Sequence, residues 1–272
     1  MVGMTTVQLD NLNYHSREAN AFYLSHSQYQ DFRTCEASAM AKIRGEWSEP
    51  ESEALKVGSY VHSWAEGVLD QFHADHPEIF LTKGSNKGEL RAPYQVAERM
   101  ISALRDDEFC MFVLSGDKEV IITAKFAGAI WKAKIDVHNP QQGRFTDLKT
   151  TQDIRKRHWD RRWGWVSFVV AYNYTTQLSL YAELDKRRFK RENWLEPLLL
   201  AVTKEEIPDK EIIAIDNLTI ERELEEIENN MPRILEVKHG GALPSRCERC
   251  DYCKSTKKLR SIIHYSNLLE GV

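Results

Sequence analysis

The feature that most limits how this chain can fold is a group of three strand-like segments near its middle. Residues 118–124, 127–138 and 143–150 are rich in β-branched and aromatic side chains, and connectors of only two and four residues separate them. Connections this short join antiparallel neighbours, because a parallel pair needs a crossover of about a dozen residues or more. The three segments therefore predict an antiparallel meander at the centre of the fold.

Segments with helical spacing of apolar residues surround this meander. They are residues 54–72, 92–107, 164–188 and 217–237. Residues 195–202 form a continuous apolar run, as expected for a strand buried on both faces, and residues 211–215 suit a further strand. The order helix, three strands, helix, two strands, helix predicts an α/β fold with a central mixed sheet flanked by helices.

Length and composition favour one globular domain. The 272 residues suffice for a single domain, 1–272, with a core at about 54–240 and segments 1–53 and 241–272 packed on it. No apolar run approaches the length of a bilayer span, and the first ten residues lack the pattern of a secretory signal. We therefore expect a cytoplasmic protein without a membrane partner. The net charge of -4 excludes a uniform polycation but leaves room for a local DNA-binding surface.

Two acidic residues and a lysine lie on the second and third strand-like segments. Because successive side chains of a strand alternate faces, Asp147 and Lys149 project to one side while Leu148 points into packing. Asp136, near the end of the preceding strand, can reach the same place. Such a group can hold Mg²⁺ and hydrolyse a phosphodiester, with the lysine stabilising developing charge. Taken alone, the same pattern also fits an exposed ion pair at a sheet edge.

Residues on two helical segments complete this group. His62 and Glu66 are four positions apart on the first, and Gln177 and Tyr181 are four positions apart on the third. Residues at this spacing share one helix face, so each pair can face the same site. A lone histidine on a helix is usually structural. Here a functional role is favoured because the candidate residues follow the order helix, strand, strand, helix, which suits a single site.

Four stretches in this order, GSYVHSWAEG, KAKIDV, TDLKTT and QLSLY, resemble the RecB-like PD-(D/E)XK nucleases. The resemblance is nearest to the phage and prophage exonucleases of the RecE (exodeoxyribonuclease VIII) type and spans roughly residues 25–253. It implies a restriction-endonuclease-like core. Ile135 stands where the family name has proline, a departure that is usual in this branch.

The resemblance also implies roles for individual residues. The ligands of a Mg²⁺ or Mn²⁺ ion would be His62, Asp136, Asp147 and the main-chain carbonyl of Leu148. Lys149 would be the catalytic lysine. Gln177 and Tyr181 match a QxxxY motif that supports the site and contacts DNA, and Glu66 is an additional catalytic candidate on the histidine's helix.

The activity implied by the resemblance is Mg²⁺-dependent hydrolysis of DNA. The enzyme would degrade one strand of a duplex end 5′ to 3′ and leave a 3′ overhang for a single-strand annealing recombinase in phage-type recombination. Related exonucleases form rings around DNA, which implies a homo-oligomer. Two alternatives stay open: a nuclease of the same fold in CRISPR spacer processing or restriction, and a non-catalytic DNA-binding module built on the cysteines.

Three of the five cysteines, Cys247, Cys250 and Cys253, form a CxxCxxC run, which predicts a metal site in a chain without an export signal. A tetrahedral site needs a fourth ligand from elsewhere. The segment around Cys35 resembles that of nucleases related to AddB and the CRISPR-adaptation exonucleases, which implies Cys35 as that ligand and a [4Fe-4S] cluster joining the chain's ends. The trio's spacing departs from that pattern, so Zn²⁺ and a metal-free knuckle stay open. Cys110 is expected to be an inert buried thiol.

A basic and aromatic stretch follows the Asp-Leu-Lys strand. Cations in it could meet phosphates, and indoles could stack on unpaired bases or wedge against a duplex end. The alternative is a solvated loop whose tryptophans cover the core. The residues assigned to DNA binding are Arg155, Lys156, Arg157, Trp159, Arg161, Arg162 and Trp163.

Overall fold

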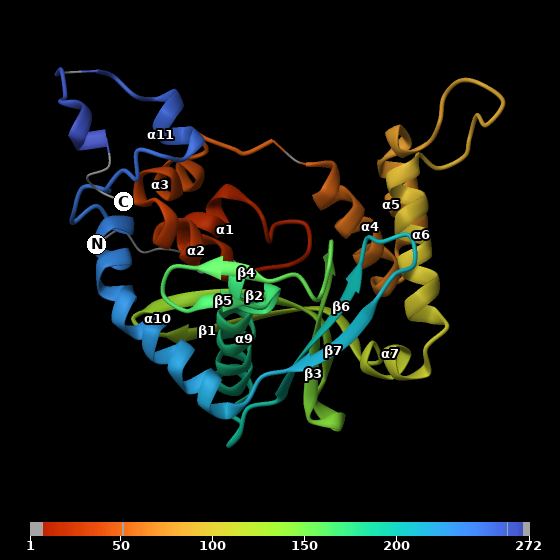
Figure 1. Ribbon diagram of the computed structural model, residues 1–272. Helices are drawn as coiled ribbons and strands as arrows, with labels where there is room; N and C mark the ends of the chain where they lie inside the picture. Colours follow the sequence, from red (N-terminus) through yellow and green to blue (C-terminus); the bar gives the residue numbers. More distant parts are fainter. Residues whose placement is uncertain (1–7, 51, 260, 269–272) are drawn as a thin grey trace.

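A mixed five-stranded sheet forms the centre of the computed structural model, which describes residues 8–50, 52–259 and 261–268 (Figure 1). The strands are β1 (Asp117–Phe126), β2 (Ala129–Asn139), β3 (Arg144–Thr151), β6 (Glu196–Thr203) and β7 (Lys210–Ala214). They lie in the order β1-β2-β3-β6-β7. Residues 1–7, 51, 260 and 269–272 of the predicted terminal segments lie outside the described ranges.

The predicted meander and the predicted buried strand are both present. The pairs β1–β2 and β2–β3 are antiparallel, as their short connectors require, whereas β3 and β6 are parallel and are joined by a long crossover. Leu199 and Ala201 of β6 pack into one hydrophobic cluster, and Leu198 and Leu200 pack into the other. The apolar run therefore is a strand covered on both faces, which confirms the expected mixed α/β sheet.

Helices cover both faces of the sheet. On one side lie α4 (Glu53–Glu66), α5 (Leu69–Asp75), α6 (Ala92–Arg105) and α7 (Glu108–Val113). On the other side lie α2 (His26–Thr34), α3 (Glu36–Arg44), α9 (Tyr174–Phe189) and α10 (Asn217–Lys238). The remaining short helices are α1 (Arg17–Phe22), α8 (Phe168–Ala171), α11 (Asp251–Ser255), η1 (Pro77–Ile79), η2 (Pro140–Gln142) and η3 (Tyr265–Leu268). Within the described ranges, every helix is too short or too polar to cross a bilayer.

Two predicted helices are wrong in extent. The helix expected over residues 54–72 ends at Gly67, whose φ of 90° suits a left-handed C-cap, and α5 begins after it. The helix expected over residues 164–188 begins only at Tyr174. Its first residues instead form β5 (Gly164–Val166), which pairs with β4 (His158–Asp160) in a separate hairpin. The apolar spacing misleads here because the tryptophans of this hairpin are exposed to solvent.

The helix α3 and the segment that follows α10 lie against each other. Figure 1 places α11 beside α3, and the backbone N–H of Ala37 donates to the carbonyl of Ser245 at 2.9 Å. The Arg233 guanidinium binds both carboxylate oxygens of Glu36, at 2.9 and 2.8 Å. These contacts fix the start of α3 against the segment that follows α10.

Candidate active site

The central sheet opens at the two acidic residues singled out by the sequence. Regular pairing of β2 with β3 ends at Val137 and Thr146, so the next opposed residues are Asp136 and Asp147. Beyond this point the backbone N–H of Leu148 donates to Asp136 Oδ2 at 2.8 Å, in place of a carbonyl of the neighbouring strand. Both carboxylates therefore stand at a fork in the sheet.

Asp147 is buried and has partners at both oxygens. Lys149 Nζ lies 2.5 Å from Oδ2, and Gln177 Nε2 donates to Oδ1 at 2.9 Å. Tyr181, one turn further along α9, is buried and hydrogen bonded to Gln177. Leu148 is fully buried against the α4–α6 side of the sheet, as strand alternation predicts. The Asp-Leu-Lys strand and the QxxxY helix thus meet at one place.

His62 reaches the fork from α4. Gly58 allows this helix to lie close to β3, since a Cβ there would stand 3.3 Å from Thr150 Oγ1. One turn later, His62 Nδ1 lies 3.5 Å from Asp136 Oδ2, and its ring also bonds the backbone of Leu148. Burial, followed by the nearby Lys149 charge, lowers the pKa of His62, so its imidazole is neutral and able to bind a metal.

Two residues near the fork were not predicted from the sequence, and one predicted residue lies at its rim. Glu119 of β1 places a carboxylate oxygen within 4.8 Å of ligand atoms of His62 and Asp136. His26 of α2 lines the same cleft, and burial, then the Lys149 charge, lowers its pKa to about 3. Glu66 is half-buried at the end of α4 and interacts electrostatically with Glu119.

Burial shapes the charge state of the fork. It raises the pKa of both Asp136 and Asp147 to about 6, against the opposing effect of the Lys149 ammonium. Burial acts to lower the pKa of Lys149, but the two carboxylates outweigh it and raise that pKa to about 12. Lys149 is therefore a cation at neutral pH rather than a proton acceptor.

The residues at the fork fit a divalent cation. They offer hard carboxylate oxygens and the backbone of Leu148, which suit Mg²⁺ and Mn²⁺, together with a neutral imidazole of the kind that binds divalent transition metals. Asp147 Oδ2 is buried and accepts no hydrogen bond of good geometry, although the Lys149 ammonium lies beside it. Asp147 Oδ2 is thus a buried oxygen that a cation could share with the Lys149 ammonium.

These pKa shifts predict that Mg²⁺ stabilises the protein in a pH-dependent way. Each of these carboxyl groups has a pKa of about 6 in the folded protein and an ordinary value of 3.8. Its contribution to the free energy of unfolding therefore falls as pH rises between those two values. Mg²⁺ binds the ionised form and offsets this loss. The Mg²⁺-induced rise in Tm should therefore be large near pH 7.5 and small near pH 5, as measured by differential scanning fluorimetry. An equal rise at both pH values would contradict the assigned ligands.

A cleft of ≈ 440 Å³ opens over the fork. Its lining includes the predicted Asp136, Asp147, Lys149, Gln177 and Tyr181. The N-terminal helices supply another part of the wall, through His26 of α2 and Lys42 of α3. The β2 strand adds Lys132 and Lys134, so several cations surround the acidic centre. A cleft of this size and charge can accept a phosphate-bearing chain end.

The basic and aromatic stretch leads into the β4–β5 hairpin (Figure 1), which packs on α8. Arg155 pairs with Glu211, and Arg162 with Glu226, whereas Lys156, Arg157 and Arg161 are exposed. Trp159 and Trp163 are exposed too, by 66% and 51%, so they do not cover the core. Trp159 meets Trp165, itself 64% exposed, edge to face at 5.5 Å.

A series of aromatic contacts connects this hairpin with the fork. The rings of His158, Tyr172 and Tyr174 contact one another in turn. Lys149 Nζ then lies 5.3 Å from the centre of the Tyr174 ring.

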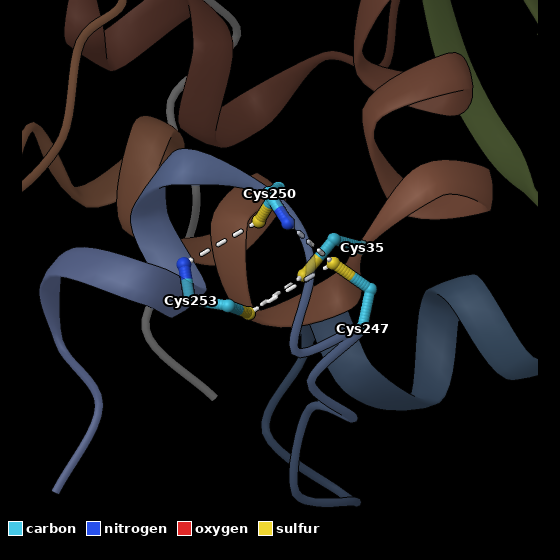
Figure 2. A group of neighbouring side chains, drawn as sticks. All are labelled: Cys35, Cys247, Cys250 and Cys253. Atoms are coloured by element: carbon cyan, nitrogen blue, oxygen red, sulfur yellow. Dashed lines mark hydrogen bonds between the residues drawn. The ribbon is translucent and has the colours of Figure 1, made fainter. Parts of the chain in front are cut away.

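The four cysteines assigned to a second metal site converge, as Figure 2 shows. Cys35 lies at the junction of α2 and α3, and its Sγ is 3.5 Å from that of Cys253. All four Sγ atoms lie within 4.8 Å of one another, and the cysteines are free thiols rather than disulfides. The backbone N–H groups of Cys250 and Cys253 donate to the sulfurs of Cys247 and Cys250, at 3.3 and 3.4 Å.

The thiols of this cluster are unequal in acidity. Burial acts to raise the pKa of Cys247, but hydrogen bonds from the backbone of Arg249 and Cys250 outweigh it and lower the pKa to about 6. Burial raises the pKa of Cys253 to about 12. Cys110 lies apart from the cluster in α7 and is buried, as predicted.

Comparisons with known proteins agree with this geometry. A family model described as a PDDEXK-like domain of unknown function (DUF3799) matches residues 25–256. The crystal structure of "Putative exonuclease" from Eubacterium rectale is 38% identical in sequence, with a TM-score of 0.91 over 98% of this chain and 100% of that chain.

More distant comparisons add little. The crystal structure of SSO0001 is 15% identical over 78% of this chain and 89% of that chain, with a TM-score of 0.28 that is too low to compare folds. No match was found among curated proteins. From its family model and its near-complete overlap with a solved structure, the chain belongs to the PDDEXK-like family DUF3799 and has the fold of the PD-(D/E)XK nucleases.

Proposed function

We propose that this protein is a Mg²⁺-dependent deoxyribonuclease whose centre is the fork between β2 and β3. The observation that carries the proposal is the meeting of Asp136, Asp147 and Lys149 with His62 at one partly buried place. Membership of a PDDEXK-like family supports it. Mn²⁺ has the same ligand preferences and is expected to substitute for Mg²⁺.

Each residue has a distinct task in this proposal. Asp136, Asp147, His62 and the Leu148 carbonyl hold the divalent cation, which when bound acidifies a water molecule and neutralises phosphate charge. The Lys149 ammonium lies where negative charge builds on the scissile phosphate and stabilises it there. Gln177 fixes the carboxylate of Asp147 through its 2.9 Å hydrogen bond, and Tyr181 supports Gln177.

The β4–β5 hairpin is the proposed contact for DNA outside the cleft. Trp159, Trp163 and Trp165 present indole faces to solvent, which favours stacking on bases or on a duplex end. Lys156, Arg157 and Arg161 carry exposed charge for the phosphates, whereas Arg155 and Arg162 are engaged in ion pairs with acidic side chains. The hairpin joins the site through the tyrosines that pack beside Lys149.

We further infer that the enzyme acts on duplex ends as an exonuclease. The support is the likeness to a protein named "Putative exonuclease", which covers nearly the whole of both chains. The 5′ to 3′ direction, and the transfer of 3′ overhangs to a single-strand annealing recombinase, follow from the RecE-type resemblance and stay predictions. The homo-oligomer that this resemblance implies also stays a prediction.

A strand-labelled digestion tests the proposed activity. Linear duplex, labelled at one 5′ or one 3′ end, is incubated with the protein and Mg²⁺, next to covalently closed circular DNA and an EDTA control. We expect the linear duplex to be degraded only with Mg²⁺, with early loss of the 5′ label, and the circle to survive. Cutting of the closed circle would reject the exonuclease and favour the CRISPR-processing or restriction alternative.

The cysteine cluster is proposed to bind a metal that joins the two ends of the chain. Four convergent sulfurs, N–H···S hydrogen bonds and a thiol of lowered pKa are typical of a metal-thiolate site. A [4Fe-4S] cluster and Zn²⁺ are the two candidates, and metal analysis distinguishes them.

A further inference from the structure

A row of three acidic residues crosses the first three strands of the sheet. Lys118 pairs with Val137 and Val120 pairs with Ile135, so Glu119 falls opposite Asp136 in the same register. Asp136 in turn falls opposite Asp147 at the fork between β2 and β3. Neighbours in one register point to the same side of a sheet. Glu119 therefore extends the acidic centre by one strand.

The backbone at Glu119 departs from strand geometry. Its φ is 53°, in the left-handed region that a glutamate rarely adopts because its Cβ crowds the backbone there. Regular pairing with Asp136 is interrupted at this residue, although pairing resumes on both sides. Strained backbone of this kind persists where the surrounding structure holds it in place, often at functional sites.

The Glu119 carboxylate is largely shielded from solvent and lies close to the site. Its side chain is only 10% exposed. One oxygen forms an ion pair with Lys134, which also lines the cleft. A carboxylate oxygen also lies within 4.8 Å of ligand atoms of His62 and Asp136, so one ion could contact all three residues. The imidazole in this group is an independent sign of a ligand site, because acids alone often cluster without one.

We propose that Glu119 is a direct ligand of the divalent cation, bound together with His62 and Asp136. The inference rests on the proposed nuclease function and adds a residue that the sequence motifs do not contain. Lys134 then acts as the counter-ion of Glu119 while the cation is absent, and the cation displaces its ammonium. An imidazole beside two carboxylates also predicts that Mn²⁺ binds more tightly than Mg²⁺.

The proposal is tested by Mn²⁺ binding in the absence of DNA. Free Mn²⁺ is followed by electron paramagnetic resonance for the wild type and for Glu119→Gln. Because an amide is a poor ligand for a hard cation, the variant should bind Mn²⁺ about 10- to 100-fold more weakly. Asp117→Asn is the matched control: it removes an exposed carboxylate two positions earlier on β1 and should bind as the wild type does.

Two further variants separate ligation from a structural role. Lys134→Met removes the competing ammonium and should tighten Mn²⁺ binding in the wild-type background but much less in Glu119→Gln, which distinguishes a freed ligand from the general loss of a nearby positive charge. Glu119→Asn tolerates a left-handed φ, so it keeps the fold if the glutamine variant does not, and it too should bind weakly.

The outcomes of this experiment are distinguishable. Wild-type affinity in both Glu119 variants, alongside measurable binding by the wild type, overturns the role of Glu119 and leaves the nuclease proposal standing. If the wild type binds no Mn²⁺, both the role of Glu119 and the proposed metal-dependent nuclease function are wrong. Loss of binding in Asp136→Asn, with binding retained in Glu119→Gln, also rejects Glu119 as a ligand.

Discussion

Replacing Lys149 with methionine reduces DNA hydrolysis by about 10²- to 10³-fold, the usual effect of removing one group that stabilises transition-state charge. Methionine has a similar length and no charge, so the cleft keeps its shape. The Lys149 ammonium lies 2.5 Å from Asp147, lines the cleft, and stays protonated because its pKa is raised to about 12. Single-turnover digestion of end-labelled duplex measures the loss.

Further variants distinguish loss of the Lys149 charge from loss of the bound cation. Lys149→Met should still bind Mn²⁺ and duplex DNA, whereas Asp147→Asn should lose both Mn²⁺ binding and cleavage. Lys125→Met is the matched control, because Lys125 is exposed at the far end of β1. If Lys149→Met digests DNA at a rate similar to the wild type, the catalytic assignment is wrong and the non-catalytic DNA-binding module becomes the better reading.

Replacing Cys35 or Cys253 with alanine should remove the bound metal and lower the Tm by about 8–16 °C. The size follows from two relations: a ligand at about 1,000 times its Kd stabilises by about 4 kcal/mol, and each kcal/mol shifts the Tm of a protein this large by about 2–4 °C. Each cysteine supplies one of four convergent sulfurs, so its loss opens the site. Metal content and thermal melts of protein purified without oxygen measure both effects.

The control for this experiment is Cys110→Ala. Cys110 is also buried and free but lies in α7, outside the cluster, so its replacement should keep the metal and cost only local packing. Iron with broad visible absorbance identifies the cluster, and stoichiometric zinc in a colourless protein identifies the single ion. Anaerobically purified wild-type protein without bound metal would contradict the proposal.

Local periodicity explains what the sequence could predict. The short connectors fix β1, β2 and β3 as antiparallel neighbours, and strand alternation alone places Asp147 and Lys149 on one side of β3. Helical spacing likewise brings Gln177 and Tyr181 to the same face of α9. Each of these statements depends on residues that are close in sequence, and the structure brings them together.

Glu119 and the β4–β5 hairpin show where such reasoning ends. Glu119 reaches the site through the register of β1 against β2 and through its left-handed backbone. The local pattern of apolar and polar residues predicts neither feature. The helix expected over residues 164–188 extends too far toward its N-terminus, because Trp165 lies in an exposed hairpin and not on a helix face packed on the core. Tertiary context rather than propensity decides these positions.

The cysteine cluster joins positions that are 218 residues apart in the chain. A staple across so long a loop removes much conformational freedom from the unfolded polypeptide, and this entropic effect grows with loop length. It also sets an order of assembly, since α2 and α3 line the cleft while Cys253 is synthesised 218 residues after Cys35. A nascent chain therefore cannot anchor this wall through the cluster until Cys253 has been synthesised.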